Sequence, residues 1–304
     1  MLRYAGRRLV TSLVTLFLVV TLTFFLMQAV PGKPFFGERI TQEMVDRIMA
    51  KYGYDEPIGV QYLNYLGDLF KGDLGYSLVV KAGEPVTKII TDYFPVSFKL
   101  GIIALAIAVC LGVPLGLLAA AKHNSIFDRC FIFFASLFVS VPSFIMTIAL
   151  MLIFAAWLNV LPVAYLDSWQ SYIMPVFGMA IYPMFHLARL TRTTMLDVTG
   201  QDYIRTARAK GLSSFKVMFK HALRNAILPV VTALGPMVAG ILTGSFVVEK
   251  VFAITGIGKF FISSISSRDY ALIMGTTVFF AVLLIFCNYV VDLLYGIIDP
   301  RIKL

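Results

Sequence analysis

Six long apolar runs constrain the fold of this chain more than any other feature of its sequence. They cover residues 9–30, 97–121, 131–157, 173–190, 226–248 and 271–294. Each reaches the roughly 18 residues at which a membrane-spanning helix becomes the default interpretation. Charged residues make up 14% of the 304 positions, whereas a soluble domain would carry about 25%. The sequence therefore predicts an all-α polytopic membrane protein with six transmembrane helices.

The distribution of Lys and Arg predicts which helix ends face the cytoplasm. Fifteen of the 26 Lys and Arg residues flank one set of ends, eight of them within residues 189–224. The short connection at 158–172 on the other side has none. Because cationic flanks are retained in the cytoplasm, we expect both termini to be cytoplasmic. The first run has 22 residues, more than the roughly 7–15 of a cleaved signal, so we expect it to remain as an anchor.

Residues 31–96 form a long segment on the predicted external side. Thr41 can cap a short helix that ends near Gly53, and Pro57 can open a second amphipathic helix. A third short helix is predicted at 85–93. We expect a small helical cap over the outer mouth of the bundle, with an ordered connection that has no function of its own as the alternative.

The predicted spans and external segment divide the chain into three parts. Residues 1–30 hold the N-terminus and the first span, residues 31–96 form the external segment, and residues 97–304 form a five-helix core. The core contains a cytoplasmic loop at about 191–225.

Charge is missing from the middle of the predicted spans. Lys99, Arg189 and Asp292 lie near span ends, where their side chains can reach the interface. This pattern argues against a proton relay or a carboxylate ion site, and so disfavours an ion-coupled secondary transporter. The three cysteines are scattered and suggest neither a disulfide framework nor a metal site.

A basic block interrupts the apolar sequence on the cytoplasmic side. Asp202 to Lys210 is a plausible short helix, with acid at its start, base at its end and Gly211 as a left-handed stop. Ser213 or Ser214 can then cap a second, amphipathic helix, on which Phe215, Met218, Phe219 and Ala222 are expected to form the apolar side. A solvated loop or a helix gripping anionic lipid also fits this pattern, whereas a nucleic-acid-binding helix-turn-helix is disfavoured because both ends join membrane spans.

The stretch RTARAKGLSSFKVMFKHALRNAILPVV resembles the EAA loop of ATP-binding-cassette (ABC) importer permeases, in the form found in the peptide branch. The family pattern E-A-A-x-x-x-G falls on Arg205, Thr206, Ala207 and Gly211, and Leu228-Pro229 is the later landmark. Arg205 stands where the general pattern has Glu, and the distance from Gly211 to Leu228-Pro229 is longer than in sugar-type permeases.

Other motifs extend the resemblance over nearly the whole chain. MLRYAGRRL, FFLMQAVPGKPF, GDLGYS, FPVSFKLG, GSFVVEKVFAITGIGKFF, SRDYALIMGT and VDLLYGIIDPRIKL are similar to membrane subunits of the dipeptide/oligopeptide/nickel group, in particular those for oligopeptides. The resemblance implies a type I ABC importer permease fold in a bacterial plasma (inner) membrane. It also implies import of oligopeptides, with dipeptides, nickel or another small solute as the alternative.

The resemblance further implies partners and a contact surface. The expected partners are a second homologous permease, two ATPase subunits that carry ATP and magnesium, an extracytoplasmic peptide-binding protein and membrane lipid, without nucleic acid. In the family the loop forms a coupling helix that docks on the ATPase. The residues implied in this coupling are Asp202, Tyr203, Arg205, Thr206, Ala207, Lys210, Gly211, Leu228 and Pro229.

The chain offers no catalytic motif of its own. A Walker A loop needs Gly five residues before its Gly-Lys and Ser or Thr after it, but Ala253 and Phe260 occupy these places around Gly258-Lys259. The hydrolase motifs G-x-S-x-G and H-E-x-x-H are absent from the sequence. We therefore expect no enzymatic activity and no cofactor or metal on this chain, with ATP hydrolysis on separate subunits.

Overall fold

The structure is a computed structural model of the whole chain. It describes residues 2–29, 41, 43, 46–47, 50, 53, 56–163, 166–242 and 246–298. The side chains of residues 2–5, 242 and 294–298 are not part of this description. Most of the helix predicted between Thr41 and Gly53 lies outside the described residues.

Helices account for most of the described chain. In order they are α1 (Leu2–Ala29), α3 (Ile58–Phe70), α4 (Val86–Ala121), α5 (Ile126–Ser140), α6 (Ser143–Met151), the π-helix η1 (Leu152–Trp157), the 3-10 helix η2 (Trp169–Tyr172), α7 (Ile173–Thr199), α8 (Asp202–Ala209), α9 (Ser214–Lys216), the π-helix η3 (Val217–Ala222), α10 (Leu223–Leu242), α11 (Phe246–Val251), α12 (Ile257–Ser267) and α13 (Tyr270–Ile298). Within the described ranges, β pairing is limited to one isolated bridge, between Tyr76 and Pro85.

The structure supports the predicted set of spans and changes the shape of the third. Among the described residues, five helices are long and apolar enough to cross a membrane, or six if one bent pair counts as a span. This pair joins 126–140 to 143–157 at an angle of 101°. Val141 is extended at the break, because the ring of Pro142 disfavours helical geometry in the residue before it. The continuous span predicted at 131–157 is therefore two helices.

Helix α4 begins earlier than the sequence suggested. The prediction of a separate short helix at 85–93 is wrong, since α4 runs without interruption from Val86 through Pro95 to Ala121. Pro85 precedes the first turn, where its missing N–H costs nothing. Pro95 lies inside the helix, and the apolar residues around it continue the helix despite the lost hydrogen bond. One long helix thus joins the predicted external segment to the core.

Close packing of α4 against α7 forms the centre of the bundle. A Cβ atom on Gly112 would lie 2.5 Å from the carbonyl oxygen of Met184, and one on Gly116 would overlap the carbonyl of Ala188. Only glycine permits this approach of two backbones, which is the usual way for helices to associate in lipid.

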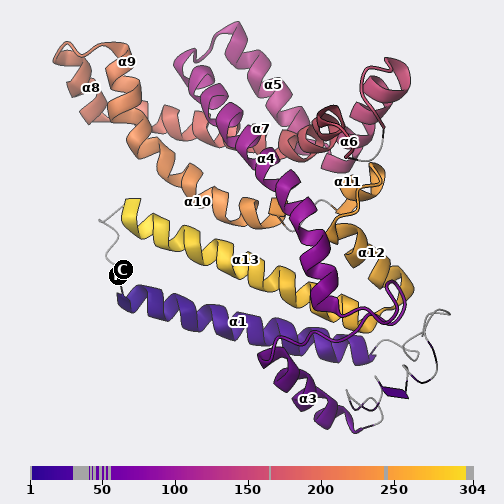
Figure 1. Cartoon of the computed structure of the whole chain (residues 1–304). Helices are drawn as coiled ribbons and strands as arrows, with labels where there is room; N and C mark the ends of the chain where they lie inside the picture. The colour runs from indigo at the N-terminus through magenta and orange to yellow at the C-terminus, as the bar shows by residue number, and fades with distance from the viewer. Residues whose placement is uncertain are drawn as a thin grey trace.

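The remaining long helices extend this bundle sideways. Helices α13 and α1 lie side by side, with α10 next to α13 (Figure 1). The first turn of α1, the last turn of α13 and the α8–α9 loop gather at one end of the molecule, and α3 and α12 lie toward the other (Figure 1). We call these the loop end and the opposite end.

Candidate functional site

Helix α8 forms the most prominent surface feature of the loop end. It begins after the extended residue Gln201, with Asp202 in its first turn and Arg208 in its last. This charge order suits the helix dipole. The predicted helix at 202–210 is thus confirmed, with Lys210 as its C-cap.

Two side chains anchor α8 to the bundle. Ile204 is fully buried and Ala207 nearly so, and both pack with Met195 of α7, Val217 of η3 and other residues. Tyr203 adds a polar link, because the side-chain amide of Asn225 donates to its hydroxyl at 2.7 Å. Ala207 therefore helps to hold α8 against its own chain.

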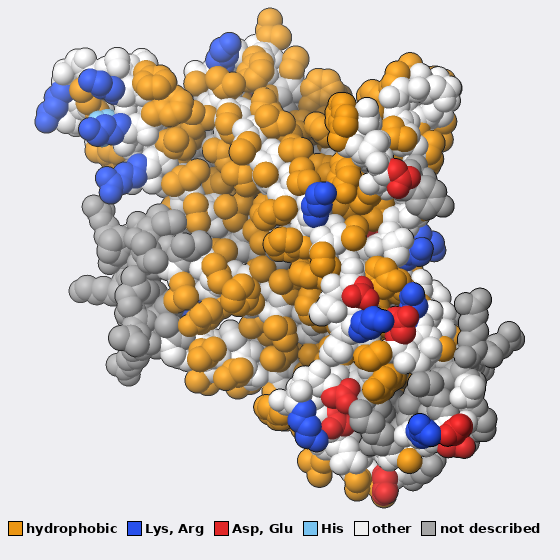
Figure 2. Space-filling model, in the orientation of Figure 1, with side chains coloured by type: hydrophobic (Ala, Val, Ile, Leu, Met, Phe, Trp, Pro, Cys, Tyr) orange, Lys and Arg blue, Asp and Glu red, His pale blue; other side chains and the backbone are white. Residues whose placement is uncertain are grey.

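The other face of α8 is exposed and charged. Asp202 and Arg205 pair at 3.5 Å with both side chains largely in solvent, and Thr206 and Lys210 are exposed beside them. Lys and Arg side chains gather over this part of the molecule at the upper left of Figure 2. The surface is suited to contact another macromolecule through charge.

Gly211 ends α8 in the left-handed conformation that its sequence position predicts. Its φ is +78°, and a Cβ atom there would meet nothing within 4 Å. The requirement for glycine is therefore conformational and not steric. Ser213 caps the next helix by accepting a hydrogen bond from the backbone N–H of Lys216, which settles the choice between Ser213 and Ser214.

The second helix departs from the expected pattern. Phe215 and Phe219 stack at 4.4 Å but are exposed, while Val217 and Ala222 are fully buried. Residues 217–222 form a π-helix, whose i→i+5 bonding changes which side chains face inward. A prediction based on α-helical periodicity therefore assigns the wrong side chains to the buried face of this helix.

Leu228 and Pro229 lie apart from this surface. Both belong to the continuous helix α10, and neither is a member of the buried cluster that holds α8. The carbonyl of Leu228 accepts a hydrogen bond from the Thr232 hydroxyl at 3.0 Å. Pro229 has no N–H, so the carbonyl of Asn225 one turn earlier lacks its usual helical donor.

A buried ion pair connects α5 and α7 at the loop end. The sequence analysis did not predict it. The guanidinium of Arg192 on α7 donates to both carboxylate oxygens of Asp128 on α5, at 2.5 and 2.8 Å. The side chain of Asp128 is 2% exposed, and its second oxygen also accepts from the N–H of Asn124. This bidentate pair fixes the α4–α5 turn to the helix that leads into α8. The spacing of the two residues in the sequence gave no signal of it.

A groove of about 450 Å³ opens between α6, α7 and α10. Most of its lining is apolar, with Pro183 and Pro236 on facing helices. Tyr182 and His186 lie one above the other on α7, with ring centroids 5.8 Å apart. The lining residues are Ser143, Met179, Tyr182, Pro183, His186, Ala233, Pro236, Met237, Gly240 and Ile241. No Asp, Glu, Lys or Arg is among them, which agrees with the uncharged span centres in the sequence.

Two buried carboxylates organise the opposite end. Glu249 of α11 is 1% exposed; it accepts the Ser97 hydroxyl at 2.6 Å and the N–H of Lys259 at 3.1 Å. A Cβ atom on Gly256 would lie 2.5 Å from this carboxylate, so the close turn into α12 depends on glycine. Glu249 thereby joins α4, α11 and α12.

Asp269 has a similar position at the start of α13. It is fully buried and accepts the Ser77 hydroxyl at 2.6 Å. The backbone N–H groups of Leu78, Val79 and Val80 also donate to it, at 3.0–3.2 Å. One carboxylate therefore holds the loop before α4 onto α13.

The arrangement of helices defines a class of protein. Two crystal forms of the inward-facing MetNI methionine ABC transporter contain chains with this fold. The native form has a TM-score of 0.55 at 14% identity, with 71% of this chain and 99% of that chain covered. The selenomethionine-soaked form has a TM-score of 0.59 at 15% identity, with the same coverage. The fold is that of a type I ABC importer permease.

The family follows from the sequence itself. Residues 112–304 match the family described as "Binding-protein-dependent transport system inner membrane component", and residues 1–101 match its N-terminal component. The chain belongs to this family, and it is a multi-pass permease subunit of an ABC importer of the inner membrane.

Named relatives match over the full length of the chain. The dipeptide transport system permease protein DppB of Bacillus subtilis (strain 168) is 48% identical over 305 residues, with 100% of this chain and 99% of the relative covered. The oligopeptide transport system permease protein OppB of Haemophilus influenzae is 44% identical over 309 residues, with 100% of both covered. The predicted resemblance to peptide permeases is confirmed.

Proposed function

We propose that this chain forms one half of the membrane path of an ATP-driven importer of oligopeptides. The observation that carries the proposal is α8, a short helix held by its buried side while its charged side is exposed at the loop end. The names of the full-length relatives supply the substrate class. Dipeptides are the second candidate, favoured by the 48% identity to DppB.

The importer would need three kinds of protein partner. A second, homologous permease would complete the path, and two ATPase subunits would bind ATP and magnesium. An extracytoplasmic peptide-binding protein would deliver the substrate. In this assembly the face of α8 with Asp202, Arg205 and Lys210 would dock on one ATPase. The left-handed conformation of Gly211 would set the angle between the docked helix and η3.

The buried ion pair between Arg192 and Asp128 supports a mechanism of this kind. It ties α7, which leads into α8, to the turn between α4 and α5. A displacement of α8 by an ATPase would therefore move α7 together with this turn. Because α7 also lines the groove, the displacement would change the width of the groove.

The groove between α6, α7 and α10 would form this chain's share of the path. Its lining has hydroxyl and imidazole groups but no formal charge from Asp, Glu, Lys or Arg. Peptides with variable side chains would pass such a lining, whereas fixed charges would reject some of them. Selection would then fall mainly on the binding protein.

We also propose the orientation given by the charge distribution. The loop end, with its Lys and Arg, would face the cytoplasm together with both termini. Residues 31–96 would then be external and 97–304 would form the core, with the coupling loop at about 191–225.

Purification in mild detergent followed by reconstitution tests the proposal. We expect ATPase subunits and a second permease to copurify, and the reconstituted complex to import labelled oligopeptides only with ATP and binding protein. The chain by itself should hydrolyse no ATP. Uptake that follows an ion gradient without ATP would contradict the importer proposal, and uptake restricted to dipeptides would select the second candidate.

A further inference from the structure

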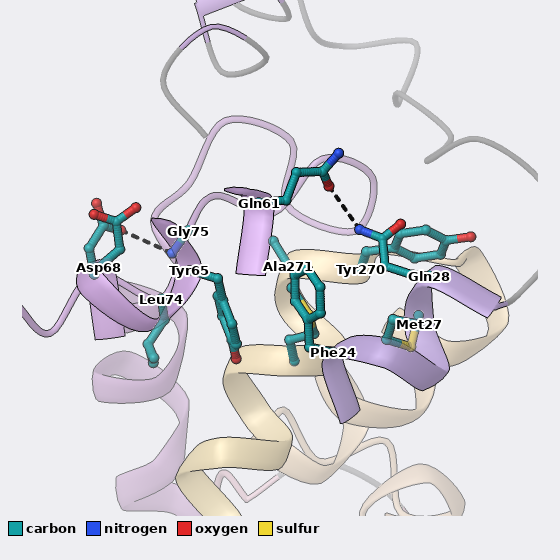
Figure 3. Close-up of a pocket in the computed structure, with 12 residues that line it drawn as sticks. Phe24, Met27, Gln28, Gln61, Tyr65, Asp68, Leu74, Gly75, Tyr270 and Ala271 are labelled. Carbon is teal, nitrogen blue, oxygen red and sulfur yellow. Dashed lines mark hydrogen bonds between the residues drawn. The ribbon is translucent and has the colours of Figure 1, made fainter. Parts of the chain in front are cut away.

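Helix α3 exposes large apolar side chains on its outer side, although Leu66 and Leu69 are partly buried on its inner side. Gln61, Tyr65 and Asp68 line a pocket between α3, the last turns of α1 and the start of α13 (Figure 3). Leu63 and Phe70 point elsewhere, with 66% and 92% of their surface exposed. A helix beside water places its apolar stripe toward the core and its polar residues outward. Helix α3 departs from this pattern, because large apolar side chains also lie on its outer side.

The contacts of α3 place it along the side of α1. The hydroxyls of Tyr62 and Thr21 lie 2.7 Å apart, and the amide of Gln28 donates to Gln61 at 2.9 Å. The ring of Phe24 stacks on Tyr65 at 5.6 Å. Helix α3 therefore packs against the last third of α1 and does not stand above its end, as Figure 1 also shows.

The positions of these contacts along α1 indicate how deep α3 lies in the membrane. Thr21 precedes the last residue of α1, Ala29, by eight residues, which corresponds to about 12 Å at ~1.5 Å per residue. The apolar span of α1, Gly6–Ala29, has 24 residues and is about 36 Å long, some 6 Å more than a hydrocarbon core of ~30 Å. Even if all of this excess projects at the C-terminal end, the Tyr62–Thr21 contact lies about 6 Å inside the hydrocarbon boundary.

The exposed side of α3 continues a surface that already faces lipid. At the same level, α1 exposes Leu22, Phe25 and Leu26. Only 11% of the apolar window of α1 is buried within the protein. The apolar residues of α3 that are exposed beside them are Ile58, Val60, Leu63 and Phe70. A continuous apolar surface of this kind is expected where acyl chains cover both helices.

We propose that α3 lies in the membrane interface, in the leaflet at the C-terminal end of α1, with Leu63 and Phe70 among the acyl chains. The partner of this face is lipid and not another protein. Lys71 pairs with Asp68 at 3.2 Å at the end of the helix, and its long side chain can reach the headgroups. This position differs from the predicted cap over the mouth of the bundle, and it does not depend on the transported solute.

Spin labelling in a bilayer tests the position of α3. Single cysteines replace Leu63 or Phe70 in a chain whose three native cysteines are changed to alanine. The labelled chain, with the subunits that copurify with it, is reconstituted into phospholipid nanodiscs. Collision rates of each nitroxide are measured with oxygen, which concentrates in lipid, and with a water-soluble nickel chelate. Leu26→Cys on α1 is the lipid-facing control, and Glu56→Cys, exposed just before α3, is the aqueous control.

We expect labels at positions 63 and 70 to behave like the label at position 26, with frequent oxygen collisions and few nickel collisions. Nickel access equal to that at position 56 would place α3 in water and overturn the proposal. Labels shielded from both reagents would show that a protein covers this face, which would also overturn it. Immobilisation of either label when the peptide-binding protein is added would likewise overturn the proposal. Because each cysteine replaces an exposed side chain, either variant alone is sufficient if the other folds poorly.

Discussion

Helix α8 and the opposite end of the molecule use charge in opposite ways. At the loop end, α8 exposes Asp202 and Arg205, and the contact between them is open to solvent. At the opposite end, Glu249 and Asp269 are buried, with backbone and side-chain donors around each carboxylate. Exposed charges leave a surface free to bind and release a partner, whereas buried carboxylates fix the loops that surround them. The comparison predicts that substitutions at buried carboxylates or their partners damage the fold, while those on α8 and at its stop, Gly211, damage transport.

The largest effect is expected for Asp269→Ala. It leaves the hydroxyl of Ser77 and three backbone N–H groups without their acceptor, and each orphaned buried donor costs about 1–3 kcal/mol. We expect a loss of roughly 4 kcal/mol or more in stability and rapid proteolysis of the loop before α4. Thermal unfolding in detergent and limited proteolysis measure both. Asp167→Ala, at an exposed aspartate, is the control; equal stability of the two variants would refute the role of Asp269.

Arg192→Gln should have the next largest effect, although it lies at the loop end. It leaves the buried carboxylate of Asp128 without its bidentate partner, and the loss of one partner from a buried pair costs about 3–5 kcal/mol. We expect a somewhat smaller loss because His123 remains 3.3 Å away. The double variant Arg192→Gln with Asp128→Asn should recover part of the stability. A double variant as unstable as the sum of the single changes would argue against direct coupling.

Gly211→Val should impair transport with little loss of protein. The strain of a β-branched residue at φ +78° is about 1–2 kcal/mol, and open space around the position means that no clash adds to it. We expect normal assembly but a several-fold loss of peptide uptake, with Gly211→Ala intermediate. Gly200→Val is the matched control, because Gly200 precedes α8 with a φ of −77° that valine can adopt. Similar uptake by the two valine variants would show that the left-handed stop is unimportant.

The smallest change in stability is expected for Arg205→Ala. Its pair with Asp202 is exposed on both sides, and such pairs contribute about 0–1 kcal/mol. If α8 docks on an ATPase, the affinity of the complex should nevertheless fall, more strongly at low salt than at high salt. Binding of the purified ATPase to nanodiscs at several salt concentrations measures this. Unchanged binding at low salt would remove Arg205 from the docking face.

Local features of the sequence determined a large part of the structure. The spans follow from the length of the apolar runs, because a helix in lipid must satisfy its own backbone and cover the hydrocarbon thickness. Helix α8 and its end at Gly211 follow from charge order and from the conformational freedom of glycine. The family motifs indicated the importer class, and the full-length relatives confirm it.

Other features depend on contacts between distant parts of the chain. In the sequence, Glu249 stands at the start of a polar connection between two spans. Its burial depends on Ser97, 152 positions away, and on a turn at Gly256. Asp269 likewise meets a loop about 190 residues earlier. Residue type alone does not reveal such pairs, because a carboxylate is equally compatible with solvent until the donors around it are known.

The sequence by itself determined which segments enter the membrane, and only the tertiary structure decided which faces those segments bury. Ile204 and Ala207 lie inward because α8 packs over α7 and η3. Val217 and Ala222, five residues apart, both lie inward while Phe219 lies outward, because the π-helix changes the phase of the side chains. Hydrophobicity drives a segment out of water whether its partner is lipid or protein, so the choice between the two is made by packing.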